Sequence, residues 1–525
     1  MEKRLVIAIA LSVLIILGFQ YLAPKPVMPP AQEPAKMVRS DSIKEAEIAQ
    51  VIIPSAEEKE LKVETDVYVL TFSNIGGAIK KIRLKNFKAS NSEESLDLVG
   101  LTNPAEYLLN ISSTTNPGLD SAVYSVNKSS GMIIYTLKTN DLQITKTYTL
   151  HKSKHSIELR ISVKNISGSS KQFNYRLIGG AGITEINDQD KRLVEVTADI
   201  NGKVLGFKKP KPNQRIINPG LVNWSVLKNK YFSLVLKPFV TTVSQFYNEN
   251  KNGTIIMGVD TESVTIQPNS FIDNRFILYA GPSSIPELKA LGHGLEVTVN
   301  YGFFGGISKI MIVVMRFFHS VTHSWGFSII LLAIFLNVLL FPLTVKSFKS
   351  MQKMQELHPQ MEQLKKQYKD SPEKLNKAVM ELYKKYKINP LSGCLPILLQ
   401  MPIFIALYAA LMRSIELRNT SFFWIKDLSS PDAVKLPFTL PLIGNSINIL
   451  PLIMVAAMIA QQKISTKTMG SAVTSEQKEQ QKIMLIVMPI VFGFIFYSMP
   501  SGLVLYWVIN TLLTITEQAT MAKNT

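Results

Sequence analysis

A few side chains that can form hydrogen bonds lie inside long apolar stretches near the C-terminal end of this 525-residue chain. Gln400, Asn510 and Thr511 are three of them. Polar groups in such surroundings are costly unless they have a partner, so inside a membrane they mark a functional site by default. We interpret them as candidates for a polar binding site, and hydrogen bonding between helices explains them equally well.

Patterns typical of catalysis or metal binding are missing from the sequence. No Walker motif occurs, and no Ser, His and Asp form a recognisable catalytic set. His319 and His323 have the i, i+4 spacing of some zinc ligands, but no third ligand and no metalloprotease Glu accompanies them. We therefore predict no enzyme activity, no cofactor and no metal site, and we interpret the two histidines as interfacial.

Five apolar segments surround the polar candidates. The apolar core of each segment contains no charged residue, and in the last segment this core is 503–515. A helix needs about 20 residues to span the hydrocarbon of a bilayer, and about 17 is the lower limit. Five such runs predict an α-helical five-span membrane core over residues 325–520. The predicted spans are about 326–345, 395–412, 436–460, 483–498 and 501–517.

The distribution of charge sets the topology of this core. The formal net charge is +18, and residues 346–387 alone contain 11 Lys against five acidic residues. Such an excess marks a cytoplasmic loop. We therefore interpret the positive net charge as basic residues gathered in cytoplasmic loops, and we predict no specific nucleic-acid binding. The nearly balanced loop after Met412 contains Phe422-Phe423-Trp424, which suits the outer interface. The C-terminus is then cytoplasmic.

The N-terminal residues predict an anchor. Lys3 and Arg4 precede an apolar run without a good cleavage site, so residues 1–22 form an uncleaved transmembrane helix with a cytoplasmic N-terminus. Residues 23–54 are rich in Pro, Ala, Lys and Glu, a composition that predicts a flexible tether outside the cytoplasm.

Residues 55–300 predict an all-β sandwich domain outside the cytoplasm. Apolar and polar residues alternate, as at 62–72 and 156–163, and turn sequences such as Asn74-Ile75-Gly76-Gly77 separate the runs. Residues 304–322 then repeat apolar side chains at helical spacing, with Lys309 and Arg316 on the other side. This pattern predicts an amphipathic helix along the membrane surface.

The basic loop, residues 346–388, has helical order of its own. Met354, Met361 and Tyr368 repeat every seven residues, and Asp370-Ser371-Pro372 is a good helix start. We predict a cytoplasmic helical hairpin that is either a charged linker or a docking arm for nascent chains, lipids or a targeting partner. Its candidate contact residues are Lys353, Lys365, Lys366, Lys384 and Lys385.

The motifs of the core resemble those of the YidC membrane protein insertases, in the Gram-negative form with a large periplasmic domain. They follow one another in order with fitting gaps and cover the whole core, whereas the β domain matches mainly at Asn74-Ile75-Gly76-Gly77. The matching stretches include Trp325-Gly326-Phe327-Ser328, Phe341-Pro342-Leu343-Thr344, Asn389-Pro390-Leu391-Ser392-Gly393, Gln400-Met401-Pro402-Ile403-Phe404, Trp424-Ile425-Lys426-Asp427-Leu428 and Pro500-Ser501-Gly502-Leu503.

This resemblance implies a bacterial inner-membrane protein whose helices enclose a groove open to the cytoplasm and to lipid. The groove takes the translocated tail of a newly made membrane protein and releases its apolar helix sideways. The implied partners are nascent membrane proteins, the Sec translocon, the lipid bilayer, and a ribosome or targeting factor. Since transfer of an apolar helix into lipid is favourable, at about 25 cal/mol per Å², no nucleotide is needed.

The resemblance also assigns groove positions and shows one departure. The family normally carries a groove-facing arginine before the Phe-Pro-Leu-Thr motif, and the match puts Asn337 there. Our hypothesis is that groove polarity replaces a fixed positive charge. Tyr506 and Trp507 fall where family members present aromatic groups to substrate, although a lipid-facing role is as good an explanation. Ala333 is a further groove position.

A small-solute transporter or channel with a β-rich outer domain is the alternative function. Transporters usually have internal repeats and helices interrupted at the midplane. The five apolar segments show no repeat among themselves, although Pro441, Pro451 and Pro489 offer places for kinks. We therefore favour the hypothesis that the protein is an insertase.

Overall fold

The computed structural model describes residues 57–89, 94–129, 131–184, 193–239, 243–368, 371–386, 395–440, 444–468 and 475–523. Its contacts divide the chain into two compact units, Met1–Asn300 and Tyr301–Thr525. The predicted anchor (1–22) and tether (23–54) lie outside the described residues.

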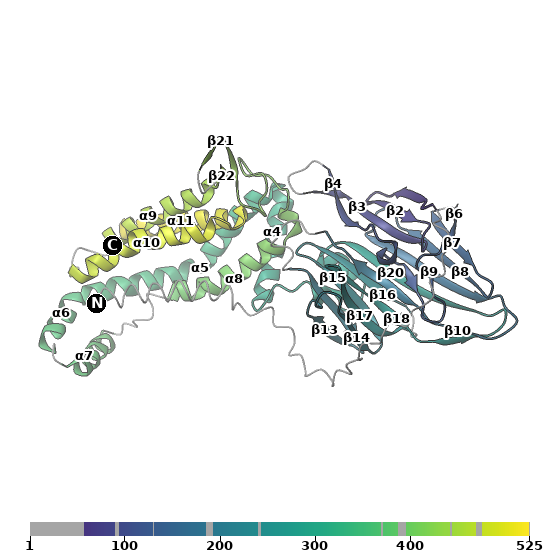
Figure 1. Cartoon of the computed structure of the whole chain (residues 1–525). Coiled ribbons are helices and arrows are strands. Elements are labelled where there is room, and N and C mark those ends of the chain that lie inside the picture. Colours follow the sequence, from purple (N-terminus) through teal and green to yellow (C-terminus); the bar gives the residue numbers. More distant parts are fainter. Residues whose placement is uncertain are drawn as a thin grey trace. The chain divides into compact units, whose positions relative to one another are not determined.

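The first unit consists of antiparallel sheets, coloured purple to teal in Figure 1. The largest sheet has nine strands in the order β13-β12-β15-β16-β20-β9-β8-β7-β6. Its strands are β6 (Ser125–Ser129), β7 (Met132–Lys138), β8 (Leu142–Leu150), β9 (Ser156–Asn165), β12 (Glu195–Ile200), β13 (Lys203–Phe207), β15 (Val222–Lys228), β16 (Phe232–Pro238) and β20 (Phe271–Pro282).

Smaller sheets complete this unit. A five-stranded sheet has the order β14-β17-β18-β11-β5, a four-stranded sheet has the order β1-β2-β3-β4, and β10 pairs with β19. Their strands are β1 (Glu60–Glu64), β2 (Tyr68–Ser73), β3 (Ala78–Lys88), β4 (Ser95–Gly100), β5 (Ile111–Ser112), β10 (Lys171–Phe173), β11 (Arg176–Ala181), β14 (Arg215–Pro219), β17 (Val243–Lys251), β18 (Thr254–Thr261) and β19 (Val264–Ile266). Helix α3 (Ile285–Ala290) follows β20.

The sheets pack face to face, as the alternating sequence predicts. Strand β11 of the five-stranded sheet contacts β16 of the nine-stranded sheet, and a Cβ on Gly179 would lie only 2.5 Å from the Leu236 side chain. The predicted strand at 156–163 lies within β9. The predicted run 62–72 is two strands instead, because residues 65–67 turn the chain so that β1 pairs with β2.

The Asn74-Ile75-Gly76-Gly77 motif forms a turn that receives buried side chains from β8. Gly76 and Gly77 have φ values of 68° and 53°, a region that favours glycine. The Lys146 ammonium donates to the Gly76 and Leu109 carbonyl oxygens, each at 2.7 Å, and the Tyr148 hydroxyl donates to the Gly77 carbonyl at 2.6 Å. Complete burial lowers the pKa of Lys146 to about 7, because desolvation disfavours the ammonium.

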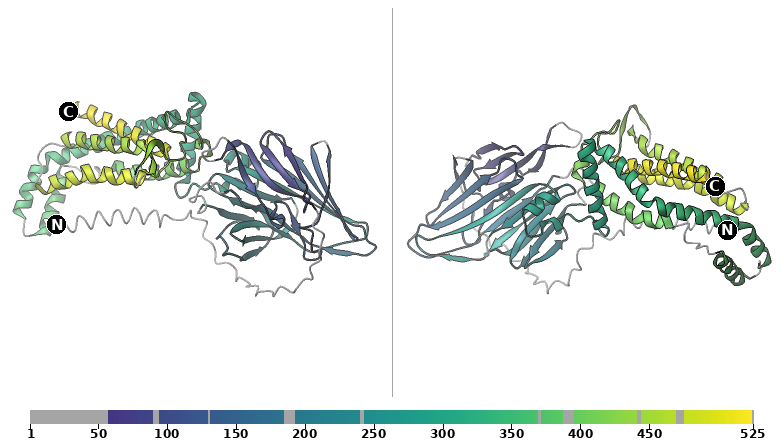
Figure 2. Two further views of the ribbon diagram at one scale, coloured as in Figure 1. Left: turned by 45° about the horizontal axis from the view of Figure 1, so that its top comes forward. Right: turned by 180° about the vertical axis from the view of Figure 1, so that it is seen from behind.

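The second unit is helical (Figures 1 and 2). Its longest helix is α5, and a β-hairpin, β21 and β22, precedes α9. The elements are α4 (Gly305–Thr322), α5 (Trp325–Glu356), α6 (His358–Gln367), α7 (Pro372–Lys385), α8 (Leu395–Arg413), the short turn η4 (Ile415–Leu417), β21 (Val434–Leu440), β22 (Gly444–Ile447), α9 (Ile449–Thr468), α10 (Ser475–Phe496) and α11 (Ser501–Lys523).

One predicted span begins too early. The segment 436–460 was expected to be a single helix, but Val434 pairs with Ile447 across the β21–β22 hairpin and α9 begins at Ile449. The residues before α9 are apolar, but they include Pro437, Pro441 and Gly444, which suit strands and turns rather than a helix. Helix α5 also continues beyond the predicted 326–345 to Glu356, with Pro342 inside it.

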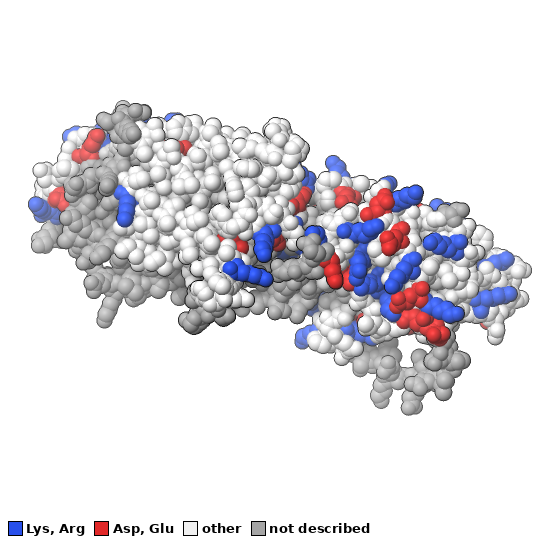
Figure 3. Space-filling view, turned by 90° about the horizontal axis from the view of Figure 1, so that it is seen from above, with Lys and Arg blue, Asp and Glu red and all other residues white. Residues whose placement is uncertain are grey.

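One of the described helices suits a bilayer in both length and composition, and the other long helices approach the required length. Among the described residues, α5 contains one stretch, Trp325–Met354, that is long and apolar enough on its own, and shorter apolar stretches lie in α8, α9 and α10. Helices α8, α9, α10 and α11 have 19, 20, 22 and 23 residues. At 1.5 Å per residue, about 20 residues reach the ~30 Å of hydrocarbon. The face of this unit seen in Figure 3 carries a broad surface without charged side chains.

Helix α4 has two apolar faces. Met311 and Met315 are buried in the helical core, and the Ser308 hydroxyl donates to the Ala406 carbonyl of α8 at 2.8 Å. Ile310, Val313, Phe317 and Val321 are exposed at helical spacing. The helix therefore packs against the core on one side and exposes a second apolar stripe, a pattern typical of helices at a membrane surface.

Candidate functional site

Two hydrogen bonds between helices join most of the polar residues expected in the core. The Asn337 amide of α5 lies 3.5 Å from the Asn510 side-chain oxygen of α11. The Gln400 amide of α8 donates to the Tyr506 hydroxyl of α11 at 3.1 Å. Helix α11 therefore carries both acceptors, four residues apart, which is about 6 Å along the helix axis.

The Asn337–Asn510 pair lies well inside the helices. Asn337 is 12 residues after the first residue of α5, Trp325, and Asn510 is nine residues after the first residue of α11, Ser501. At 1.5 Å per residue these offsets correspond to about 18 Å and 14 Å, roughly half the hydrocarbon thickness. Asn337, Gln400 and Asn510 are each only half-buried. Their side-chain amides therefore form hydrogen bonds and still remain partly accessible from outside the core.

The other groove candidates differ in access. Ala333 and Tyr506 are fully buried in the helical core, so neither presents a free surface. Thr511 is buried as well, and its hydroxyl donates to the Trp507 carbonyl of its own helix at 2.8 Å. Its hydrogen bond stays within α11 and joins no second helix. Trp507 is half-buried.

Trp507 belongs to an aromatic cluster that connects three helices. Its ring centroid lies 5.2 Å from Phe404 of α8, 5.1 Å from Phe496 of α10 and 5.6 Å from Phe492 of α10. The three phenylalanines were missed in the sequence. Phe404 follows Gln400 by four residues, and Phe492 and Phe496 are also four apart, so helical spacing puts each pair on one face.

The loop between α8 and β21 fastens the ends of two helices. Asp432 accepts hydrogen bonds from the backbone amides of Ile449 and Leu450, at 2.8 and 2.9 Å, and so caps α9. The amides of Ser501 and Gly502, at the start of α11, donate to the carbonyls of Ser430 and Leu428. Two of the motifs read in the sequence, 424–428 and 500–503, thus contact each other.

An ion pair fixes α4 to the same loop. Arg316 of α4 pairs with Glu416 of η4. The two residues are 100 positions apart, and the sequence offers no local signal for the pair. His319 stacks on Trp325 with ring centroids 4.0 Å apart. The part of the chain that is described contains no cluster of three or more His, Cys, Asp or Glu that could hold a metal ion.

The five candidate lysines of the hairpin are exposed. Lys353 lies near the end of α5, Lys365 and Lys366 on α6, and Lys384 and Lys385 on α7. A small apolar cluster holds α6 and α7 together: Met354, Met361, Val379 and Leu382 pack against Leu357 and Tyr383. The side chains of this cluster therefore pack inward, whereas Met380 and Tyr386 are exposed, and the lysines are left to solvent or a partner.

A β-rich domain followed by apolar helices with paired polar side chains defines a two-part integral membrane protein. Residues 60–314 match the YidC periplasmic domain, and residues 317–525 match the 60Kd inner membrane protein family. The membrane protein insertase YidC of Geotalea daltonii is 32% identical over 557 residues, which cover 100% of this chain and 99% of that protein. The same-named protein of Pelobacter propionicus is 33% identical over 559 residues, with coverage of 100% and 99%.

The chain therefore belongs to the YidC family of membrane protein insertases. The family is one of inner-membrane proteins with a periplasmic domain, and its members are insertases rather than enzymes. A solved structure described as an active YidC insertase aligns with 88% of this chain and 92% of its own, at 18% identity. Its TM-score is 0.34, so the assignment rests on the sequence matches.

Proposed function

We propose that this protein is a membrane protein insertase and chaperone that helps newly made proteins enter and fold in the inner membrane, alone or with the Sec translocon. The observation that carries this proposal is the pair of hydrogen bonds between helices, Asn337–Asn510 and Gln400–Tyr506, within apolar helical stretches that contain no charged residue. The full-length similarity to proteins named as insertases supports it.

The proposed topology has five spans, α5, α8, α9, α10 and α11, preceded by an N-terminal anchor at 1–22. The β domain is periplasmic, and both termini and the α6–α7 hairpin are cytoplasmic. The exposed lysines of the hairpin support this orientation, since an excess of basic residues favours the cytoplasmic side. The aromatic residues Phe423 and Trp424, both exposed, suit the opposite interface.

The polar pairs would act by exchanging partners. A peptide group without a hydrogen-bond partner in an apolar medium costs about 2–7 kcal/mol. A hydrogen bond between membrane helices contributes only ~0.6 kcal/mol on average and ~1.7 kcal/mol at most. Opening the pair to receive a translocating polar tail is therefore cheaper than leaving the tail unsatisfied. The groove lowers the barrier for the polar tail, and the apolar helix that follows enters lipid spontaneously.

The hairpin would serve as the first docking point for a nascent chain, a ribosome or a targeting factor. Its lysines present positive charge on an exposed surface, beside a small apolar cluster that packs between α6 and α7. Charge of this kind raises the rate of encounter more than it raises affinity. A salt-sensitive early step in insertion is therefore expected.

Site-specific photocrosslinking to a ribosome-bound nascent membrane protein tests the proposal. Probes at Asn337 and Trp507 should crosslink to the substrate, whereas a probe at Phe494, which is 83% exposed on α10, should mark lipid. Ala333 is a weaker position because it is buried. Absence of crosslinks at Asn337 and Trp507, in a protein that carries a small solute across vesicles, would favour the transporter instead.

A further inference from the structure

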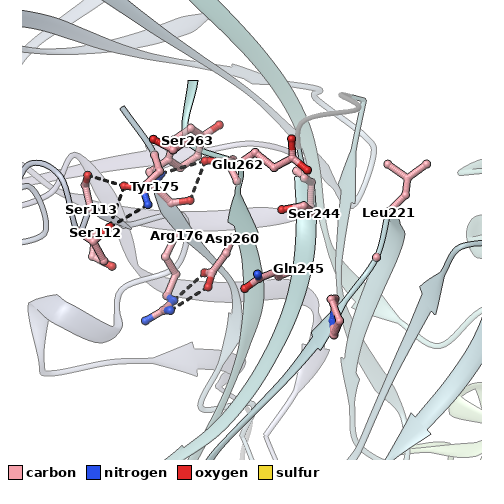
Figure 4. Close-up of a pocket in the computed structure, with 16 residues that line it drawn as sticks. Ser112, Ser113, Tyr175, Arg176, Leu221, Ser244, Gln245, Asp260, Glu262 and Ser263 are labelled. Carbon is pink, nitrogen blue, oxygen red and sulfur yellow. Dashed lines mark hydrogen bonds and ion pairs between the residues drawn. The ribbon is translucent and has the colours of Figure 1, made fainter. Parts of the chain in front are cut away.

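A cleft of about 740 Å³ lies in the β domain, at one end of the five-stranded sheet. All five strands of that sheet contribute to its lining where they begin or end, as Figure 4 shows for Ser112, Arg176, Gln245 and Asp260. Ligand pockets in proteins commonly have volumes of about 300–1,000 Å³. The cleft thus has the size of a binding site, and the insertase activity proposed above makes no use of it.

Part of the lining is held rigidly. Arg176 donates two hydrogen bonds to Asp260, at 2.7 and 2.9 Å, and its guanidinium lies 4.7 Å from the Tyr247 ring centroid. The Asn174 side chain is fixed by Thr114, to whose hydroxyl it donates at 2.8 Å. Groups that are already in place lose little freedom when a ligand arrives, which favours binding.

Another part of the lining is free to bind. The side chains of Ser112, Ser244, Gln245, Glu262 and Ser263 have no hydrogen-bond or ion-pair partner among the described residues. Ser112, Ser244 and Gln245 are half-buried, so water reaches them only in part. Hydroxyl and amide groups both donate and accept hydrogen bonds, and they match a ligand that does the same.

The charge of the cleft excludes anions as ligands. One guanidinium, Arg176, faces two carboxylates, Asp260 and Glu262, so the lining carries a formal charge of +1 − 2 = −1. Phosphate-bearing ligands would be repelled by Glu262 and would find Arg176 already engaged by Asp260. A neutral ligand rich in hydroxyl groups satisfies the free hydroxyls and amides without this conflict.

A peptide fits this cleft less well. Extended peptides usually add to an open strand edge through their main chain and insert alternate side chains into apolar pockets. Here strand ends make the lining, and most of their side chains are polar, although apolar side chains such as Leu221 and Val243 also line the cleft. We propose that the cleft binds a neutral glycan, through the free hydroxyls of Ser244 and Ser263 and the amide of Gln245. The lining residues include no histidine, so a binding role is inferred and no reaction.

Binding of neutral oligosaccharides to the full-length protein in detergent tests this proposal. Maltotriose, cellotriose and triacetylchitotriose serve as probes, with an extended Ser- and Asn-rich peptide as the competing class. Ser263→Trp should block the cleft without touching the sheet, since Ser263 is exposed. Gln245→Ala should remove a direct contact. Ser153→Trp, at another exposed serine of the same domain, is the matched control.

At least one trisaccharide is expected to bind, about tenfold more weakly to Ser263→Trp and to Gln245→Ala and equally well to Ser153→Trp. Insertion activity should be unchanged in all three variants, which separates this test from that of the proposed function. Binding of none of the trisaccharides, binding that both cleft variants retain in full, or binding of the peptide alone would each overturn the proposal.

Discussion

The side-chain amide of Asn337 on α5 lies 3.5 Å from the side-chain oxygen of Asn510 on α11, which is longer than the usual range of about 2.7–3.2 Å for such a hydrogen bond. The pair joins residues 173 positions apart, and both are only half-buried. A long hydrogen bond between accessible groups is weak and easily exchanged. Such a bond suits the proposed function, in which this pair opens for a passing polar segment and then closes again.

Replacing Asn337 with Leu should slow insertion. The variant leaves Asn510 without its partner and, in the proposed groove, gives a polar tail one hydrogen-bonding group fewer. A loss of about 0.6–1.4 kcal/mol in transition-state stabilisation corresponds to a roughly three- to tenfold lower rate. The measurement is insertion of a single-span substrate with a polar tail into vesicles that contain the purified protein.

Val338→Leu is the control for that experiment, because Val338 is the neighbouring residue and is 67% exposed, which suits contact with lipid. It should insert substrates at the native rate. If Asn337→Leu also does so, polarity at this position is irrelevant to the activity.

The Gln400–Tyr506 bond should behave as a single unit in a double-mutant cycle. Gln400→Leu and Tyr506→Phe each remove the same hydrogen bond, so the double variant should insert substrates no more slowly than either single variant. Each single change should cost about 0.6–1.7 kcal/mol, or a roughly three- to twentyfold lower rate if the bond matters in the transition state. Fully additive losses would show that the two groups act separately.

Much of the architecture follows from local sequence pattern. Alternation predicts strands such as β9, and the Asn252-Gly253 pair forms the two-residue turn between β17 and β18, where Lys251 pairs with Thr254. Apolar length predicts the long helices. These features are local, because each depends on residues within a few positions of one another.

Pairings between distant residues are not encoded in such patterns. Arg316 and Glu416 form an ion pair, and Trp507 contacts Phe404, although no periodicity connects them. The apolar residues before α9 misled the prediction of the third span for a different reason: hydropathy does not distinguish a β-hairpin from a helix when both are apolar. The three-dimensional structure is needed to see which polar residues share a partner.

Removing the cap of α9 should destabilise the helical core. Asp432 accepts from the amides of Ile449 and Leu450 and also from the Trp424 indole at 3.2 Å. Asp432→Ala should lower the free energy of unfolding by about 0.5–2 kcal/mol, the usual cost of losing a cap. Thermal unfolding in detergent measures it. Asp432→Asn keeps an acceptor oxygen and should lose less, and equal losses in the two variants would contradict the capping role.

The buried ammonium of Lys146 should make the stability of the β domain depend on pH. Its pKa is about 7 in the folded chain and 10.5 ordinarily, so between these values the unfolded chain binds more protons. The free energy of unfolding should therefore rise with pH across this window, by at most about 1.4 kcal/mol per unit. Urea unfolding at pH 7 and pH 9, followed by fluorescence of the buried Trp224 with the other tryptophans replaced by Phe, measures the rise.

The control is Lys146→Met, which has no group to titrate at this position. It should therefore lack the rise of about 2–3 kcal/mol in the free energy of unfolding between pH 7 and pH 9. It also leaves the Gly76 and Leu109 carbonyls without their donor and should be less stable than the native chain at pH 9. The same rise with pH in both proteins would assign it to other groups.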